Sequence, residues 1–228
     1  MSLKVNTDIE VNLRELNERI NQACQRVGRL PDEVTIVAVT KMVAPSAIAT
    51  ASRLGIRHFG ENRVQEAEKK IGRLTWLEPQ PTWHMVGHLQ TNKVKVAVEI
   101  FDIIHSIDSI RLAEVISRRT QRTLPILLEV NVSGEASKGG FSVAEVEPAL
   151  EAISHLPGLE IKGLMTIAPM ATDAEQVRPI FQKLCSLRDS FGLEHLSMGM
   201  TDDFEVAIEE GATMLRIGRA IFGEGETK

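Results

Sequence analysis

Apolar runs alternate with amphipathic segments along most of this chain. Eight short, mostly apolar runs recur after residue 34, and the first of them is almost entirely β-branched and free of charge up to Thr40. Runs of this composition predict strands that are buried on both faces, as in parallel sheets. Their predicted bounds are 35–40, 57–60, 83–87, 103–106, 126–132, 161–167, 195–199 and 214–217.

Each segment between two of these strands has an apolar face at helical spacing. Eight strands separated by seven helices predict a single α/β domain, a (β/α)₈ TIM barrel covering residues 1–228, because doubly wound sheets usually have fewer strands. Pro148 and Pro179 fall inside two predicted helices, which must therefore begin later or kink. The predicted helices are 46–53, 63–70, 91–98, 110–119, 143–153, 175–191 and 204–210.

An extra N-terminal helix is expected before the first strand. Apolar residues recur every three or four positions over residues 7–27, which is the stripe of an amphipathic helix. Thr7 and Glu10 have the spacing of a capping box, and Gly28 provides a stop. We therefore expect this helix to begin near Thr7.

Composition excludes several classes of protein. The formal net charge of −5 argues against a nucleic-acid partner. No apolar stretch is long enough to span a membrane, and the N-terminus has no signal-peptide pattern. Cys24 and Cys185 fall at apolar helical positions, which favours free thiols in a reducing compartment. We expect a cytoplasmic protein, and a monomer, because the tail 223–228 contains no evident dimerisation element.

The first predicted strand ends in a lysine. Residues 34–40 are almost all β-branched or small, and Lys41 follows them directly. In α/β barrels the carboxyl ends of the strands converge on the active site, so we expect Lys41 at that mouth. Burial there would favour the free amine, which attacks aldehydes. The alternative is a lysine that only extends its amine to water at a strand end.

The last two strands are followed by loops suited to an anion. Barrels of this type often bind a phosphate after strands seven and eight, through backbone amides. Ser197 would supply a hydroxyl there, while Gly199 and Gly218 would let the backbone approach closely. The glycines could instead serve only tight turns. An aldehyde that carries a phosphate, such as pyridoxal 5'-phosphate, would use both these loops and Lys41.

Arg216 precedes the last of these loops. It could face the pyridine nitrogen of that cofactor, where it would stay protonated and hold the nitrogen as an acceptor. The ring would then be a weak electron sink. Alternatively, Arg216 could form an ion pair with an acidic residue in the barrel wall.

Several ordered motifs make the chain resemble a known family, the pyridoxal phosphate homeostasis proteins. Their fold is similar to the N-terminal barrel of alanine racemases, which is called fold-type III. The resemblance covers nearly the whole chain and lies in residues 37–41, 58–66, 83–93, 105–108, 131–141, 163–167, 196–200 and 216–223.

The resemblance implies a specific set of cofactor contacts. Lys41 would form a Schiff base with pyridoxal phosphate, Asn62 would lie near the ring hydroxyl, and Arg216 would face the pyridine nitrogen. Ser197, Gly218 and Arg219 would contact the phosphate. Many family members have Thr or Ser at the position of Arg219. The implied cofactor-binding residues are Lys41, Asn62, Ser197, Arg216, Gly218 and Arg219.

The function implied is intracellular homeostasis of the cofactor by storage, delivery or sensing, without substantial catalytic turnover. Apo-enzymes that use pyridoxal phosphate would be the acceptors. Lys138, in the loop 133–140, could be a transient acceptor during cofactor exit or only a solvated loop charge.

Two alternative functions have signals of their own in the sequence. A racemase or lyase of the same fold needs proton transfer on the cofactor, and alanine racemases use a tyrosine as their second base, whereas this chain contains no tyrosine. A zinc site at His84 and His88 would need helical spacing, but residues 83–87 predict a strand. We therefore expect no metal, and we place His84 beside the cofactor.

Overall fold

The computed structural model describes residues 2–135 and 138–223. Eight parallel strands in these residues form a closed barrel, as the sequence predicts. The barrel strands are β1 (Thr35–Val39), β2 (His58–Glu61), β3 (Thr82–Met85), β4 (Ile103–Ile107), β5 (Leu124–Asn131), β7 (Leu159–Met165), β8 (His195–Ser197) and β9 (Met214–Ile217).

The first and last strands close the barrel by pairing with each other. Val37 of β1 lies in register with His58 of β2 on one side and with Arg216 of β9 on the other. A short additional strand, β6 (Phe141–Ser142), pairs with β5 outside the ring. The sequence pattern does not predict β6, because two residues are too few to show a period.

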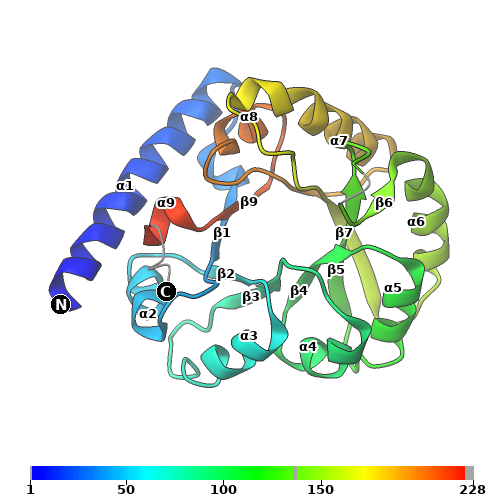
Figure 1. Ribbon diagram of the computed structural model, residues 1–228, viewed down its shortest axis with the longest axis horizontal. Coiled ribbons are helices and arrows are strands. Elements are labelled where there is room, and N and C mark those ends of the chain that lie inside the picture. Colours follow the sequence, from blue (N-terminus) through cyan, green and yellow to red (C-terminus); the bar gives the residue numbers. More distant parts are fainter. Residues whose placement is uncertain (1, 136–137, 224–228) are drawn as a thin grey trace.

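Helices surround the ring of strands (Figure 1). Those that follow the barrel strands pack their apolar faces on its outer surface, where the larger hydrophobic core lies. These helices are α2 (Pro45–Arg53), α3 (Val64–Ile71), α4 (Val94–Ile100), α5 (Ile110–Ser117), α6 (Val146–Ser154), α7 (Arg178–Ser190), α8 (Phe204–Glu209) and α9 (Arg219–Phe222).

The extra N-terminal helix is α1 (Ser2–Arg26), and it packs against α2, α8 and α9. It therefore covers the seam where β1 meets β9 (Figure 1). Arg26 lies 2.6 Å from Glu209 of α8, and Arg19 lies 2.7 Å from Glu205 of the same helix. These exposed pairs add orientation more than stability, since pairs of this kind contribute about 0–1 kcal/mol each.

Two local predictions require correction or refinement. Because α1 begins at Ser2, Thr7 lies inside the helix and is not its cap, so the predicted capping box is wrong. Helices α6 and α7 begin later than the pattern suggests. Pro148 and Pro179 consequently fall in first turns, where a missing backbone N–H costs no helical hydrogen bond.

The barrel interior contains both apolar and polar layers. Alternate residues of each strand point inward, and four of them form a small separate core together with Val86, which directly follows β3. The remaining inward positions include buried His84, His105, Ser197 and Arg216. The members of the small core are Val37, Val86, Leu127, Met165 and Met214. No helix in the described part of the chain is long and apolar enough to cross a membrane.

Strand β7 depends on a glycine for its close approach to β8. A Cβ atom added at Gly163 would lie 2.0 Å from the backbone oxygen of His195, which no side-chain movement can relieve. We expect Gly163→Ala to lower the free energy of unfolding by roughly 2–4 kcal/mol. Gly139→Ala is the control, because its Cβ would meet only the Glu129 carboxylate at 3.8 Å. Urea unfolding followed by circular dichroism measures both, and equal stability of the two variants would contradict this packing.

Candidate functional site

The residues selected from the sequence gather at one end of the barrel. Because all barrel strands are parallel, their carboxyl ends share one face. Lys41 follows β1, Asn62 follows β2, Ser197 ends β8 and Gly218 follows β9. The structure thus brings these predicted positions to a common mouth.

Lys41 lies in a turn two residues beyond β1, and its side chain is exposed. The next residue, Met42, has a φ of 60° and is 74% exposed. The expectation that the protein buries the Lys41 amine is therefore wrong. The physical reason is that the chain turns out of the barrel wall at this point, whereas Thr40 is still fully buried.

A buried ion pair stabilises the turn that carries Lys41 and Met42. The Nζ atom of Lys70, from α3, lies 2.9 Å from Oε1 of Glu61 and 2.7 Å from Oε1 of Glu66, and it also donates to the backbone oxygen of Thr40. The Thr40 hydroxyl donates to Glu61 at 2.6 Å, and the backbone N–H of Met42 donates to Glu66 at 2.7 Å. The position of the turn is consequently fixed by α3.

Two buried oxygen atoms near the mouth have no hydrogen-bond partner within the described residues. They are Oε2 of Glu61 and Oδ1 of Asn62. A buried acceptor without a donor costs about 1–3 kcal/mol, so these atoms mark where a ligand could donate. Asn62 borders an open pocket of about 490 Å³ together with Arg63, Gly87 and Lys93.

Arg216 is buried in the barrel interior, with 5% of its surface exposed. Its Nη1 donates to the backbone oxygen and to the hydroxyl of Ser197, both at 2.7 Å, and its Nη2 donates to the backbone oxygen of Thr166 at 2.7 Å. Among the described residues no carboxylate lies within ion-pair distance of Arg216, which rules out the alternative of an ion pair in the barrel wall there. Two of its five N–H bonds, on Nη2 and Nε, have no partner in the same residues.

The charge of Arg216 is influenced by its surroundings. Burial lowers the pKa of its guanidinium to about 10, and the more distant carboxylates of Asp203 and Glu129 oppose this effect. The group remains a cation at neutral pH. Burial also raises the pKa of each of these two carboxyl groups above its ordinary value.

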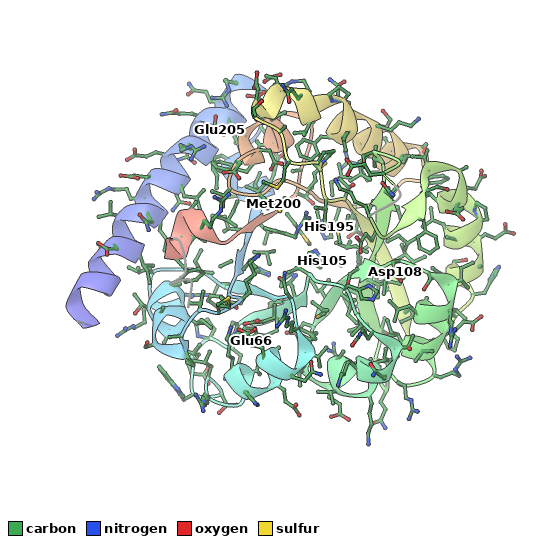
Figure 2. All side chains as sticks on the ribbon, in the orientation of Figure 1. Glu66, His105, Asp108, His195, Met200 and Glu205 are labelled. Carbon is green, nitrogen blue, oxygen red and sulfur yellow. The ribbon has the colours of Figure 1, made fainter. Side chains whose placement is uncertain are left out.

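Three histidines continue from Ser197 across the interior. We call His58, His84 and His105 the histidine row. The Nδ1 atom of His105 lies 2.8 Å from the Ser197 hydroxyl, its Nε2 lies 2.8 Å from Nδ1 of His84, and Nε2 of His84 lies 3.0 Å from Nδ1 of His58. Figure 2 shows His105 within the ring of strands.

Burial lowers the pKa of every histidine in the row, that of His84 to about 3. All three are therefore neutral at physiological pH. The described residues contain no group of three or more His, Cys, Asp or Glu side chains that could hold a metal ion, and His88 pairs with Asp108 instead of joining His84.

The sequence pattern did not indicate His58 or His105 as functional residues. The available signal was a histidine at an inward position in each of three consecutive strands, which is unusual inside apolar runs. Lys70 was also missed, because a lysine on an amphipathic helix gives no sign of which carboxylate it meets.

The loops after β8 and β9 lie side by side at the mouth. The backbone N–H of Arg216 donates to the backbone oxygen of Gly199 at 3.0 Å. Gly199 adopts a φ of +91°, and a Cβ atom added there would lie 2.6 Å from Cβ of Ala207. Gly218 caps α9. The Arg219 side chain forms an ion pair with Asp202, so its contact with a phosphate stays a prediction.

The Ser197 hydroxyl is already bonded within the protein. It accepts from Arg216 and is bonded to His105. The contact of this hydroxyl with a phosphate therefore stays a prediction. Lys138 is anchored, because its Nζ donates to the backbone oxygen of Ile167 at 3.2 Å and lies 3.6 Å from Glu135. It is not a freely solvated charge.

The sequence matches known proteins over nearly its whole length. The family model for the alanine racemase N-terminal domain matches residues 11–226. A pyridoxal phosphate homeostasis protein of Aquifex aeolicus is 43% identical over 221 residues, which cover 93% of this chain and 96% of the relative. One from Escherichia coli K12 is 40% identical over 232 residues, with 95% and 96% covered. The chain belongs to the pyridoxal phosphate homeostasis protein family.

Solved structures support membership of this family. The PipY protein of Synechococcus elongatus, determined with pyridoxal phosphate bound, is 37% identical with a TM-score of 0.81, and the alignment covers 94% of this chain and 100% of PipY. An alanine racemase of Corynebacterium glutamicum has a TM-score of 0.70 at 16% identity, and this chain covers 60% of it. The latter likeness shows a common fold alone.

The Glu61–Lys70 pair generates a prediction about stability and pH. Lys70→Met would leave the Glu61 carboxylate buried without its cation, and we expect a loss of about 3 kcal/mol near neutral pH. Burial already raises the pKa of Glu61, and Lys70 opposes that rise. Without Lys70 the folded pKa rises further. The protonated form is then favoured in the fold, and stability falls as pH rises through the folded pKa.

The deficit of Lys70→Met should therefore shrink when pH is lowered from about 8 towards about 5. Lys69→Met, one position away on the exposed face of α3, is the matched control and should cost little at any pH. Denaturant unfolding at several pH values measures both variants. A deficit that grows on acidification would exclude this account of Glu61.

Proposed function

We propose that this protein binds pyridoxal 5'-phosphate and serves the homeostasis of that cofactor, by storing it, delivering it or reporting its level. The observation that carries this proposal is the similarity to pyridoxal phosphate homeostasis proteins at about 40% identity over nearly the whole chain. PipY, which is comparably similar, was solved with pyridoxal phosphate bound.

The residues at the mouth have the chemistry that this cofactor requires. The ring hydroxyl would donate to Oδ1 of Asn62, a buried acceptor that lacks a partner in the described chain. The pyridine nitrogen would accept from a free N–H of Arg216. Backbone groups of Gly199 and Gly218 offer a close approach to the phosphate, with Arg219 and Ser197 beside them.

Pyridoxal phosphate supplies an aldehyde that bonds reversibly to amines. We assign that bond to Lys41. Because Lys41 is exposed, its reactivity would come from proximity, with the ring and phosphate contacts holding the aldehyde beside the amine. The turn is fixed by Lys70 and Glu66, so the amine is presented at a defined place.

Arg216 favours storage over turnover. It has no neighbouring carboxylate in the described residues that could accept its proton, and its pKa of about 10 keeps it charged at neutral pH. A pyridine nitrogen held by such a donor stays unprotonated and withdraws electrons weakly. The proposed function therefore has no substantial catalytic turnover.

A racemase or lyase is the second candidate, favoured only by the match to the alanine racemase N-terminal domain. The absence of tyrosine from the sequence removes the residue that serves as second base in alanine racemases. Lys41 would act on one face of the ring only.

We also propose the setting in which the protein works. The exposed position of Lys41 lets an incoming amine reach the bound aldehyde, so apo-enzymes that need pyridoxal phosphate are suitable acceptors. Cys24 and Cys185 are free thiols, which suits the cytoplasm. A monomer would be sufficient, because every residue assigned to the site comes from one chain.

The assignment of Lys41 can be tested by covalent trapping. Mixing the protein with pyridoxal phosphate should give an absorbance band in the near-visible range, and borohydride should then fix the ligand to one lysine. Peptide mass spectrometry should place it on Lys41. Lys41→Ala should lose the trapped product, whereas Lys69→Ala should retain it. Trapping at another lysine in the wild-type protein would remove Lys41 from the site.

Storage and catalysis predict different exchange and transfer rates. In deuterated water the loaded protein should exchange the α-proton of alanine about 10²–10⁴ times more slowly than an alanine racemase does, since a second positioned base is missing. NMR measures this exchange. The loaded protein should also restore activity to an apo-enzyme when the two are mixed directly. Rapid α-proton exchange would favour the racemase or lyase instead.

A further inference from the structure

The histidine row is a buried feature that the proposed function does not use. It is built on a regular stagger of the sheet. His58 lies opposite Thr82, two residues before His84, and His84 lies opposite Ile103, two residues before His105. Each step therefore moves one strand along the barrel and two residues towards the mouth. The row joins half-buried His58, at the start of β2, to fully buried His105.

Beyond His105 the hydrogen bonds cross to the other side of the barrel. Ser197 of β8 lies 2.8 Å from His105 Nδ1, and Arg216 of β9 donates to the Ser197 hydroxyl. Five polar side chains thus form one continuous path through the interior. Other charged or titratable groups that influence it are Asp102 near His58, and His195 near His105.

Counting protons along this path fixes its direction. Arginine can only donate, so the Ser197 oxygen accepts from Arg216, and its own buried O–H is satisfied only if it donates to another group. Within the described residues the remaining partner of that hydroxyl is Nδ1 of His105. His105 therefore accepts at Nδ1 and, being neutral, carries its proton on Nε2.

The same count continues to the end of the row. His105 Nε2–H donates to Nδ1 of His84, so His84 also carries its proton on Nε2 and donates to Nδ1 of His58. His58 then carries its proton on Nε2 as well. No nitrogen in the row is left to accept a further proton without the loss of a hydrogen bond. This agrees with the lowered pKa values of all three.

We propose that His58, His84 and His105 are positioning residues that act as one hydrogen-bonded unit, all in the Nε2–H form, and that they hold the Ser197 hydroxyl as the acceptor that orients Arg216. The value of this arrangement for cofactor binding rests on the proposed function, in which Arg216 faces the pyridine nitrogen. The polarity of the row itself does not depend on that function.

The row provides what a carboxylate partner would otherwise provide. It orients the guanidinium through neutral groups, so Arg216 keeps its full charge and its two spare N–H donors. A carboxylate in place of Ser197 would neutralise that charge and compete for those donors. The polarity also reaches His58, which means that a change at Arg216 should alter the tautomer at the far end of the row.

Long-range ¹H–¹⁵N NMR of protein labelled at histidine distinguishes the two tautomers and the cation of each ring. In the protein without added ligand, His58, His84 and His105 should all be Nε2–H at neutral pH. Exposed His155 is an internal reference. A predominant Nδ1–H form or a cation at any of the three would overturn the proposal.

Substitution of Arg216 tests whether the row acts as a unit. Arg216→Gln introduces an acceptor for the Ser197 hydroxyl, so the Nδ1–H population should rise severalfold at His105, His84 and His58 together. Arg216→Lys keeps a pure donor and should retain the Nε2–H form. Arg118→Gln, on the exposed surface, is the matched control and should change nothing.

A response confined to His105 in Arg216→Gln would overturn the unit. If Arg216→Gln does not fold, His105→Asn removes the end of the row that meets Ser197. His58 should then show mixed tautomers, whereas the tautomers of Arg216→Lys should match those of the wild-type protein. An unaltered His58 in His105→Asn would likewise contradict the proposal.

Addition of pyridoxal phosphate separates this proposal from the proposed function. With the cofactor on the free N–H bonds of Arg216, all three histidines should stay Nε2–H. If the Ser197 hydroxyl instead turns to donate to the phosphate, all three should convert to Nδ1–H, which would overturn the proposed donation from Ser197 to His105 and the polarity of the row. Failure of the cofactor to bind, seen as no near-visible band, would refute the proposed function while the tautomers still report on the row.

Discussion

The candidate site depends on the burial of one guanidinium. A charge inside a barrel is costly unless nearby groups accept its hydrogen bonds, and Arg216 meets this need through Ser197 and Thr166 with no adjacent carboxylate in the described chain. Much of the polar interior follows from this constraint. Ser197 accepts from Arg216. In the proposed polarity His105 accepts from Ser197, and the other histidines follow in turn.

A second buried charge solves a different problem. Lys70 forms a direct ion pair with Glu61 and also donates to the backbone oxygen of Thr40, so the pair stabilises the turn that carries Lys41. The two buried cations therefore have different roles at the mouth of the barrel. The charge of Lys70 is balanced by Glu61 and Glu66, and its ammonium group fixes the backbone at Thr40. Arg216 has no carboxylate partner among the described residues and can offer N–H donors to a ligand. Lys41 itself is exposed on the turn that Lys70 holds.

The fold was largely predictable from the sequence because buried strands are nearly continuous apolar runs and the intervening helices have one apolar face. The common mouth followed from parallel strands alone. Details set by three-dimensional contact were not predictable. Lys41 proved exposed because a turn after β1 leads the chain outward, and Arg216 proved unpaired because neutral oxygens reach it first. The histidine row depends on strand stagger, which a linear pattern does not contain.

The docking of α1 has a consequence for how the protein is made. This helix is the first element of the described chain to leave the ribosome, yet it packs on α8 and α9, which are among the last. Its apolar stripe has no complete partner until synthesis of the barrel is nearly finished. Full packing of α1 is therefore a late step, which needs α8 and α9 in place. A nascent chain stalled before β9 would expose that stripe, and such a surface is one that chaperones bind.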